Sequence, residues 1–158
     1  NIIHDVIDHA NNGRYLLGIC NGFQILTEIG LLKGALIQNE SIKFLGKDCH
    51  IKKKFDNKFN CNIKDNEVLQ IPVAHNEGNF YCDQETLSYL QDEGLIAFEY
   101  CRGEYQIDDA NINGSLDNIA GITNKNKNIL GMMPHPERAY QDFHASKDGK
   151  KIIESILS

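Results

Sequence analysis

Two hydrophobic patterns alternate along the first thirty positions of the chain. Helical spacing opens the sequence, with apolar residues at Ile2, Ile3, Val6, Ile7 and Ala10. It predicts a helix that ends at Asn12-Gly13, where glycine can adopt the left-handed cap conformation. A short apolar strand over residues 14–19 follows, and a second helical pattern begins after Gly22 and ends at Gly30. Alternation of helix, strand and helix favours an α/β domain with a mostly parallel sheet.

The rest of the chain is richer in predicted strands, separated by Asn, Asp and Lys clusters that are typical of turns. Strands are predicted over residues 35–38, 47–55, 67–73, 95–100, 119–123 and 129–133. Helices are predicted over residues 85–93, capped by Gly94, and over residues 147–157. The run of lysines at 52–54 is interpreted as the solvated face of a hairpin.

Length and composition indicate one globular domain. The chain has 158 residues, of which 41% are hydrophobic and 24% charged, and the mean hydropathy is −0.40. These values exclude a disordered chain and a coiled coil. The net charge of −6 argues against nucleic acid as a partner, and no apolar run approaches membrane-spanning length. Since no secretory leader is apparent, we expect a cytoplasmic protein without a membrane partner.

Five cysteines form an odd set without a C-x-x-C spacing: Cys20, Cys49, Cys61, Cys82 and Cys101. We interpret them as reduced thiols and expect no metal site. The chain also opens with Asn1 in place of Met, inside a helical pattern. We therefore expect a leading segment to be absent from the sequence.

The first candidate for chemistry is Gly18-Ile19-Cys20-Asn21-Gly22, at a predicted strand-to-helix turn. It is the thiol form of the G-x-S-x-G nucleophile elbow, in which glycines leave room for a strained turn that projects the nucleophile. At a helix amino end, the thiolate form of Cys20 is favoured, and the N–H of Asn21 is placed to donate to an oxyanion. A buried structural cysteine in a glycine-rich turn is the other interpretation.

The second candidate is Met133-Pro134-His135-Pro136-Glu137. A residue before proline is pushed into extended geometry, and side chains two apart in an extended chain point to the same side. Glu137 can then accept from one imidazole nitrogen of His135 and leave the other for the thiol. A solvated proline-rich turn is the alternative. Because parallel strands end at the same sheet edge, Cys20, His135 and Glu137 together predict a nucleophile, a base and its orienting acid.

These residues resemble the signature of the triad-type (class I) glutamine amidotransferases, a G-x-C-x-G-x-Q elbow with a distal H-P-E. Within that family, the chain is similar to the branch that serves phosphoribosylformylglycinamidine synthase in purine biosynthesis. Four stretches carry the resemblance, namely residues 18–24, 72–78, 113–122 and 131–138. The implied fold is flavodoxin-like, with a mostly parallel sheet flanked by helices.

The resemblance implies that Cys20 attacks the side-chain amide of glutamine, that His135 transfers protons, and that Glu137 orients His135. Glutamate and ammonia would be the products, and a synthetase subunit (PurL-like) would use the ammonia to convert formylglycinamide ribonucleotide to formylglycinamidine ribonucleotide. A small bridging subunit (PurS-like) is a further implied partner. ATP and Mg would be used by the synthetase subunit, and no cofactor is expected in this chain.

The resemblance also assigns substrate-binding residues. Asn21 and Gln24 lie on the elbow and its helix, while His75 and Glu77 belong to a loop that frames the glutamine pocket in the family. The family usually has glycine where Asn76 stands here. Taken in isolation, Gln24 is an ordinary helix position, and His75 and Glu77 are ordinary surface residues.

The chain departs from the family at its amino end. The first sheet strands and a Gly-rich loop that carries the second oxyanion donor are not found in the sequence. Residues 1–158 are therefore expected to form a single glutamine amidotransferase domain that is truncated at its amino end. Losing one oxyanion donor costs roughly a hundred- to a thousandfold in rate, so the fragment alone is expected to be a poor enzyme.

Two other functions are compatible with parts of the sequence. A cysteine hydrolase of the intracellular-peptidase kind shares the elbow and the sheet, but Gln24 and the distal H-P-E are not typical of it. A non-catalytic docking subunit would keep the shape without turnover, and the intact Cys20, His135 and Glu137 argue against it.

Overall fold

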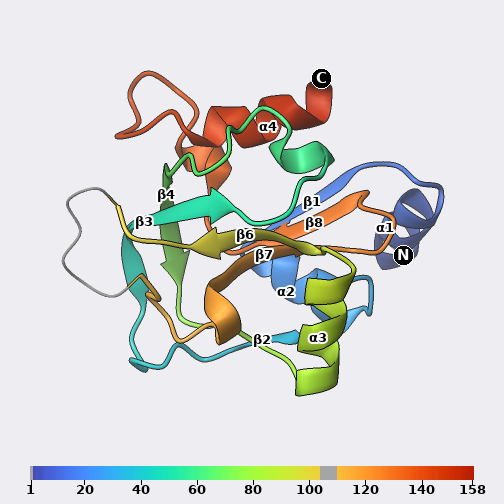
Figure 1. The fold of residues 1–158 in the computed structure, drawn as a ribbon. Helices are drawn as coiled ribbons and strands as arrows, with labels where there is room; N and C mark the ends of the chain where they lie inside the picture. The colour runs from blue at the N-terminus through green and yellow to red at the C-terminus, as the bar shows by residue number, and fades with distance from the viewer. Residues whose placement is uncertain (1, 104–109) are drawn as a thin grey trace.

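The structure is a computed structural model that describes residues 2–103 and 110–158 (Figure 1). Its elements in chain order are α1 (Ile2–Asn11), β1 (Leu16–Ile19), α2 (Asn21–Glu28), β2 (Ala35–Ile37), β3 (Leu45–Lys53), η1 (Lys58–Asn60), β4 (Leu69–His75), β5 (Asn79–Tyr81), α3 (Gln84–Asp92), β6 (Ile96–Tyr100), η2 (Leu116–Asn118), β7 (Ile119–Thr123), β8 (Ile129–Met132), η3 (Pro136–Arg138) and α4 (Gly149–Leu157).

The main sheet has six strands in the order β1-β8-β7-β6-β3-β4, and β2 and β5 form a small antiparallel pair. Within the described residues, β1 and β8 are the parallel neighbours of this sheet, and its other four pairs are antiparallel. The expectation of a mostly parallel sheet is therefore wrong for these residues. Short connections such as the turn over residues 124–128 can join only antiparallel neighbours, whereas parallel neighbours need a long crossover.

Helices cover both faces of the sheet, so the domain has three layers (Figure 1). On one face, α2 and α3 bury Phe23, Leu26, Leu87 and Leu90 in an apolar cluster. On the other face, Ile152 of α4 joins a second cluster with residues of β3, β4 and β6. This α/β arrangement confirms the predicted fold class, because both faces of the central strands are buried.

Most predicted elements are present, with shifts at their ends. Gly13, Gly30 and Gly94 all have positive φ (75°, 77° and 62°), as expected of residues that follow a helix. The strand over 119–123 has the predicted bounds, whereas β4 extends two residues beyond its predicted end, to His75. That extension places His75 on the buried side of the strand.

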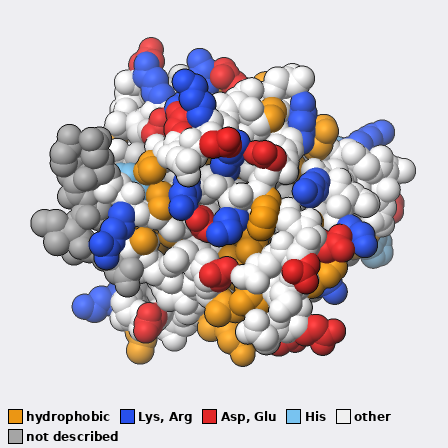
Figure 2. Space-filling view, in the orientation of Figure 1, with side chains coloured by type: hydrophobic (Ala, Val, Ile, Leu, Met, Phe, Trp, Pro, Cys, Tyr) orange, Lys and Arg blue, Asp and Glu red, His pale blue; other side chains and the backbone are white. Residues whose placement is uncertain are grey.

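Charges of both signs are interspersed over the face shown in Figure 2. The lysine run is only partly solvated, which differs from the prediction: the Lys53 side chain is 13% exposed and pairs with Asp56 and Asp65, while Lys52 and Lys54 reach Glu99 of the neighbouring strand at 3.0 and 3.1 Å. None of the helices among the described residues is long and apolar enough to cross a bilayer.

Candidate active site

Cys20 occupies a strained turn between β1 and α2, as the elbow motif predicts. Its backbone has φ 53° and ψ −109°, a conformation that costs about 1–3 kcal/mol for a residue other than glycine. The turn is held from two sides, because Cys20 N donates to Met132 O at 2.9 Å and Phe23 N donates to Cys20 O at 2.9 Å. The thiol is thereby fixed at the amino end of α2, next to the end of β8.

The two elbow glycines do not contribute equally. A Cβ atom on Gly18 would lie 2.4 Å from Leu26 Cδ1 and 2.9 Å from the backbone of Gly22, so no larger residue fits there. Apart from its chain neighbours and the backbone of its own helix, a Cβ atom on Gly22 would meet no described atom within 4 Å. Close approach of strand and helix therefore requires the first glycine.

His135 lies beside the elbow because β8 runs parallel to β1, with Ile19 opposite Met132. The backbone N–H of His135 donates to Pro72 O at 2.8 Å, which ties this segment to β4 as well. Its side-chain Nδ1 lies 2.6 Å from Glu137 Oε1. The predicted pair of imidazole and carboxylate is thus formed.

The local geometry of this pair differs from the prediction. His135 itself is close to extended, with φ −101° and ψ 84°, but a 3-10 turn begins at Pro136. The contact is therefore made across a turn and not along an extended chain. Pro136 occupies the first position of this turn, where a backbone N–H would have no partner within the turn. Because proline has no N–H, it favours the start of the turn.

The electrostatics of His135 favour its charged form. The His135 side chain is buried, and its Nε2 has no hydrogen-bond partner at normal hydrogen-bond distances. The nearby Cys20 thiol nevertheless has the largest effect on the pKa of the ring. Cys20 and then Glu137 raise the pKa of His135 from 6.5 to about 9. Burial alone would raise the pKa of Glu137, but the bond to His135 and nearby charges lower it overall. The site is therefore suited to hold an imidazolium between a thiol and a carboxylate.

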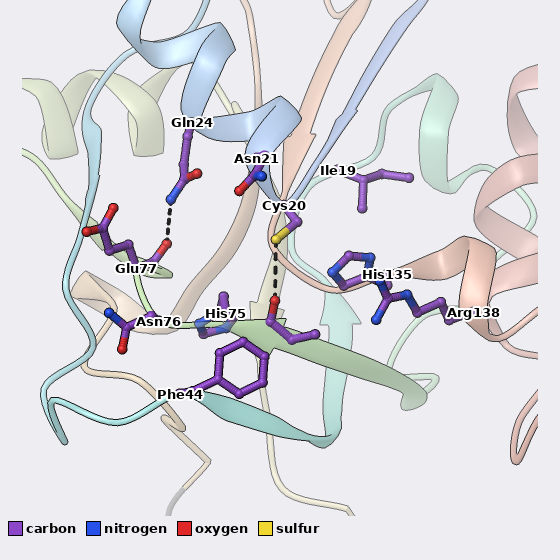
Figure 3. A pocket seen from close by; sticks show the side chains of 11 residues that line it. Ile19, Cys20, Asn21, Gln24, Phe44, His75, Asn76, Glu77, His135 and Arg138 are labelled. Carbon is purple, nitrogen blue, oxygen red and sulfur yellow. Dashed lines mark hydrogen bonds between the residues drawn. The ribbon is translucent and has the colours of Figure 1, made fainter.

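A cavity of about 580 Å³ lies in front of the thiol (Figure 3). Its lining consists of Ile19, Cys20, Asn21, Gln24, Phe44, Ala74, His75, Asn76, Glu77, His135 and Arg138. The Cys20 S–H donates weakly to Ala74 O at 3.6 Å, across the cavity from α2 to β4. The volume is in the range of small-molecule sites.

The cavity brings together six of the seven residues singled out from the sequence, and the seventh, Glu137, supports His135. Gln24 Nε2 donates to Glu77 O at 2.9 Å, which joins the elbow helix to the loop after β4 (Figure 3). His75 is only 4% exposed, so the surface interpretation is wrong for it, whereas Glu77 is exposed. The chemical roles of these residues stay predictions.

Sequence reasoning missed three residues at the site. Arg138 and Phe44 line the cavity, and the buried Asn39 lies behind it. The position of Arg138 directly after the H-P-E was a usable signal. For Phe44 and Asn39 the sequence carries no signal, since their positions depend on the long segment between β2 and β3.

The stretch over residues 113–122 supports the loop from behind. Asn113 Nδ2 donates to Gly78 O at 2.7 Å, and Ser115 Oγ donates to the same oxygen at 3.3 Å. Both side chains are buried. Two motifs that are far apart in the sequence thus form one structural unit behind the cavity.

The elbow thiol, the paired imidazole and the α/β sheet define the class of the protein as a glutamine amidotransferase-like domain. Residues 1–155 match the family described as the CobB/CobQ-like glutamine amidotransferase domain. The chain belongs to this family.

Similar proteins agree with this assignment. The chain is 48% identical over 159 residues to phosphoribosylformylglycinamidine synthase subunit PurQ of Chlorobaculum parvum, covering 99% of this chain and 63% of that protein. It is 47% identical over 158 residues to the protein of the same name from Koribacter versatilis, covering 99% and 68%. The chain thus spans about two thirds of the length of these relatives.

Solved structures show the same fold. A chain in the structure of PurLQS from Thermotoga maritima superimposes with a TM-score of 0.83 and 37% identity, covering 99% of this chain and 66% of that chain. A glutamine amidotransferase from Thermotoga maritima, at 16% identity and a TM-score of 0.55, shares the fold alone.

Proposed function

We propose that this chain is the glutamine-hydrolysing part of an amidotransferase that releases ammonia from the side chain of glutamine. The observation that carries the proposal is the meeting of the Cys20 elbow and the His135–Glu137 pair at one cavity. A thiol and an imidazole with a raised pKa suit acyl transfer through a covalent thioester.

In the proposed reaction, the Cys20 sulfur attacks the carboxamide carbon, and a tetrahedral oxyanion forms. His135 then protonates the departing nitrogen, so that ammonia leaves and a thioester remains. Water, deprotonated by His135, attacks the thioester and releases glutamate and the thiol. Glu137 holds the ring in the required orientation throughout.

The oxyanion requires hydrogen-bond donors at the turn. The backbone N–H of Asn21 is the proposed first donor, because it follows the nucleophile at the amino end of α2. A second donor from a Gly-rich loop, and the extent of the domain that it implies, remain predictions drawn from the family resemblance.

Glutamine itself is proposed to bind between α2 and the loop of residues 75–78. Gln24 and Glu77 line the end of the cavity beyond Cys20 (Figure 3). Their mutual hydrogen bond, from Gln24 Nε2 to Glu77 O, supports this proposal because it holds the two walls at a fixed separation.

The proposed acceptor of the ammonia is a synthetase subunit that converts formylglycinamide ribonucleotide to formylglycinamidine ribonucleotide with ATP and Mg. Support comes from the relatives named as a subunit of phosphoribosylformylglycinamidine synthase and from the similar chain in a PurLQS structure. A small bridging subunit is the further proposed partner. No cofactor is proposed for this chain.

Labelling with a chloroketone analogue of glutamine, in the full-length protein with its partners, tests the proposal. We expect stoichiometric modification of Cys20, protection by glutamine, and no modification of the exposed Cys61. If glutamine does not slow the labelling, the proposal that glutamine is the substrate is wrong. Turnover of peptides without turnover of glutamine would favour the peptidase alternative, and neither labelling nor turnover would favour a docking subunit.

A further inference from the structure

A single buried side chain, Asn39, holds both ends of the loop after β4. Its Oδ1 accepts from His75 Nδ1 and from Gly78 N, each at 3.0 Å. Its Nδ2 donates to His75 O and to Lys43 O, each at 2.9 Å. Its backbone N–H also donates to Asn76 O at 2.9 Å. With only 1% of its surface exposed, Asn39 acts as an internal brace for one wall of the cavity.

These contacts determine where the protons of His75 lie. Since the amide nitrogen of Asn39 donates to two carbonyl groups, Oδ1 is necessarily the acceptor in the contact with His75. The Nδ1 of His75 therefore carries the hydrogen. In the neutral ring Nε2 is then unprotonated, and this atom is buried without a hydrogen-bond partner.

The site thus holds two imidazoles with different partners. Glu137 places a carboxylate on Nδ1 of His135, whereas Asn39 places a neutral amide on Nδ1 of His75. Burial and the charge of His135 lower the pKa of His75 from 6.5 to about 4. Environments that give two like groups such different pKa values suit the groups to different roles in a site.

We propose that Asn39 and His75 are a positioning pair, in which Asn39 braces the loop and keeps His75 as the neutral Nδ1–H tautomer. Of the two imidazoles that line the cavity, only His135 then exchanges protons. The inference rests on the proposed function, because a second imidazolium would oppose the charged form of His135 that protonates the departing ammonia.

Several ionisable groups lie on the described elements around His75. Cys20, His135, Glu77 and Arg138 line the cavity with His75, Glu40 and Lys43 lie on the segment of Asn39, and the paired strand β3 carries Lys47, Asp48, Cys49 and His50 further along its register. The ring hydrogen bond of His75 goes to Asn39, not to any of these groups. Replacing that amide with a carboxylate is therefore the direct way to charge the ring.

The test compares Asn39→Asp with Asn60→Asp. Asn60 is also buried, and its amide also donates to two carbonyl groups, of Phe55 and Ala97, while its Oδ1 accepts from Asn57 N. Each substitution removes two donor bonds to backbone carbonyl groups and buries a carboxylate. Only the change at Asn39 puts the carboxylate on an imidazole.

Ring-nitrogen NMR on the full-length wild-type protein should show His75 neutral, with the hydrogen on Nδ1, from about pH 5.5 to 8. In Asn39→Asp, His75 should titrate inside that range. In the assembled complex, Asn39→Asp should lower kcat/KM for glutamine at about pH 6 at least tenfold below Asn60→Asp, and the gap should close as the pH rises.

A wild-type His75 with its hydrogen on Nε2, or one that titrates near pH 6.5, would overturn the proposal even where Asn39→Asp fails to fold. Equal losses in the two variants at every pH would also overturn it. If the wild-type complex does not hydrolyse glutamine, the proposed function fails, whereas the NMR result still decides the tautomer of His75.

Discussion

The Nδ1 atom of His135 lies 2.6 Å from Oε1 of Glu137, and this contact determines how the ring faces the elbow thiol. A charge-assisted bond of this length resists rotation of the imidazole. It leaves Nε2 on the side of Cys20, and Cys20 raises the pKa of His135 more than Glu137 does.

Glu137→Gln should weaken catalysis without abolishing it, because the base remains while its orientation and charge stabilisation are lost. We expect kcat/KM for glutamine to fall about a hundredfold. Without the carboxylate, the pKa of His135 should drop below its value of about 9. The pH-rate profile of the complex measures this drop, and an unchanged alkaline limb would show that Glu137 does not act on His135.

Cys20→Ala should separate the two half-reactions in the assembled synthetase. Glutamine-dependent synthesis should fall by roughly a thousandfold or more, since the nucleophile is lost. Ammonia-dependent synthesis should continue, because the synthetase subunit does not need the thiol when ammonia is supplied. Cys61→Ala, at an exposed cysteine, is the control and should retain both activities. Loss of both activities in Cys20→Ala would refute this division of labour.

The two histidines should give opposite pH dependences of stability. The pKa of His135 is raised from 6.5 to about 9, so its stabilisation is complete below pH 6.5 and is lost as the pH rises through 9. The pKa of His75 is lowered to about 4, so stability is lost as the pH falls from 6.5 through 4. Urea unfolding measures the difference in free energy of unfolding between wild type and each variant. For His135→Gln this difference should shrink at high pH, and for His75→Gln it should shrink at low pH. The same trend in both variants would contradict these environments.

Gly18→Ala and Gly22→Ala should differ sharply although both change the elbow motif. A methyl group at Gly18 overlaps Leu26 and the backbone of Gly22, and such overpacking costs about 1–3 kcal/mol or more. At Gly22 there is room, and alanine in a helix is favoured over glycine by up to about 1 kcal/mol. Thermal unfolding measures both changes, and equal destabilisation would show that the turn is packed differently.

The sequence by itself determined the elements that local chemistry controls. Helical spacing and glycine caps located α1, α2 and α3, and the elbow and the H-P-E predicted Cys20, His135 and Glu137 as a catalytic set, whose chemical roles stay predictions. These features are readable because periodicity, positive φ and residues next to proline act over a few neighbouring positions.

Only the tertiary structure decided what depends on distant segments. The mixed sheet follows from which strands pair, and pairing is set by packing across the whole core. His75 is buried and contacts Asn39, which lies 36 residues away in the sequence, so no local sequence pattern predicts this contact. The lowered pKa of His75 and the raised pKa of His135 are therefore consequences of the fold, because burial and partner charge shift a pKa only once the chain has brought those groups together.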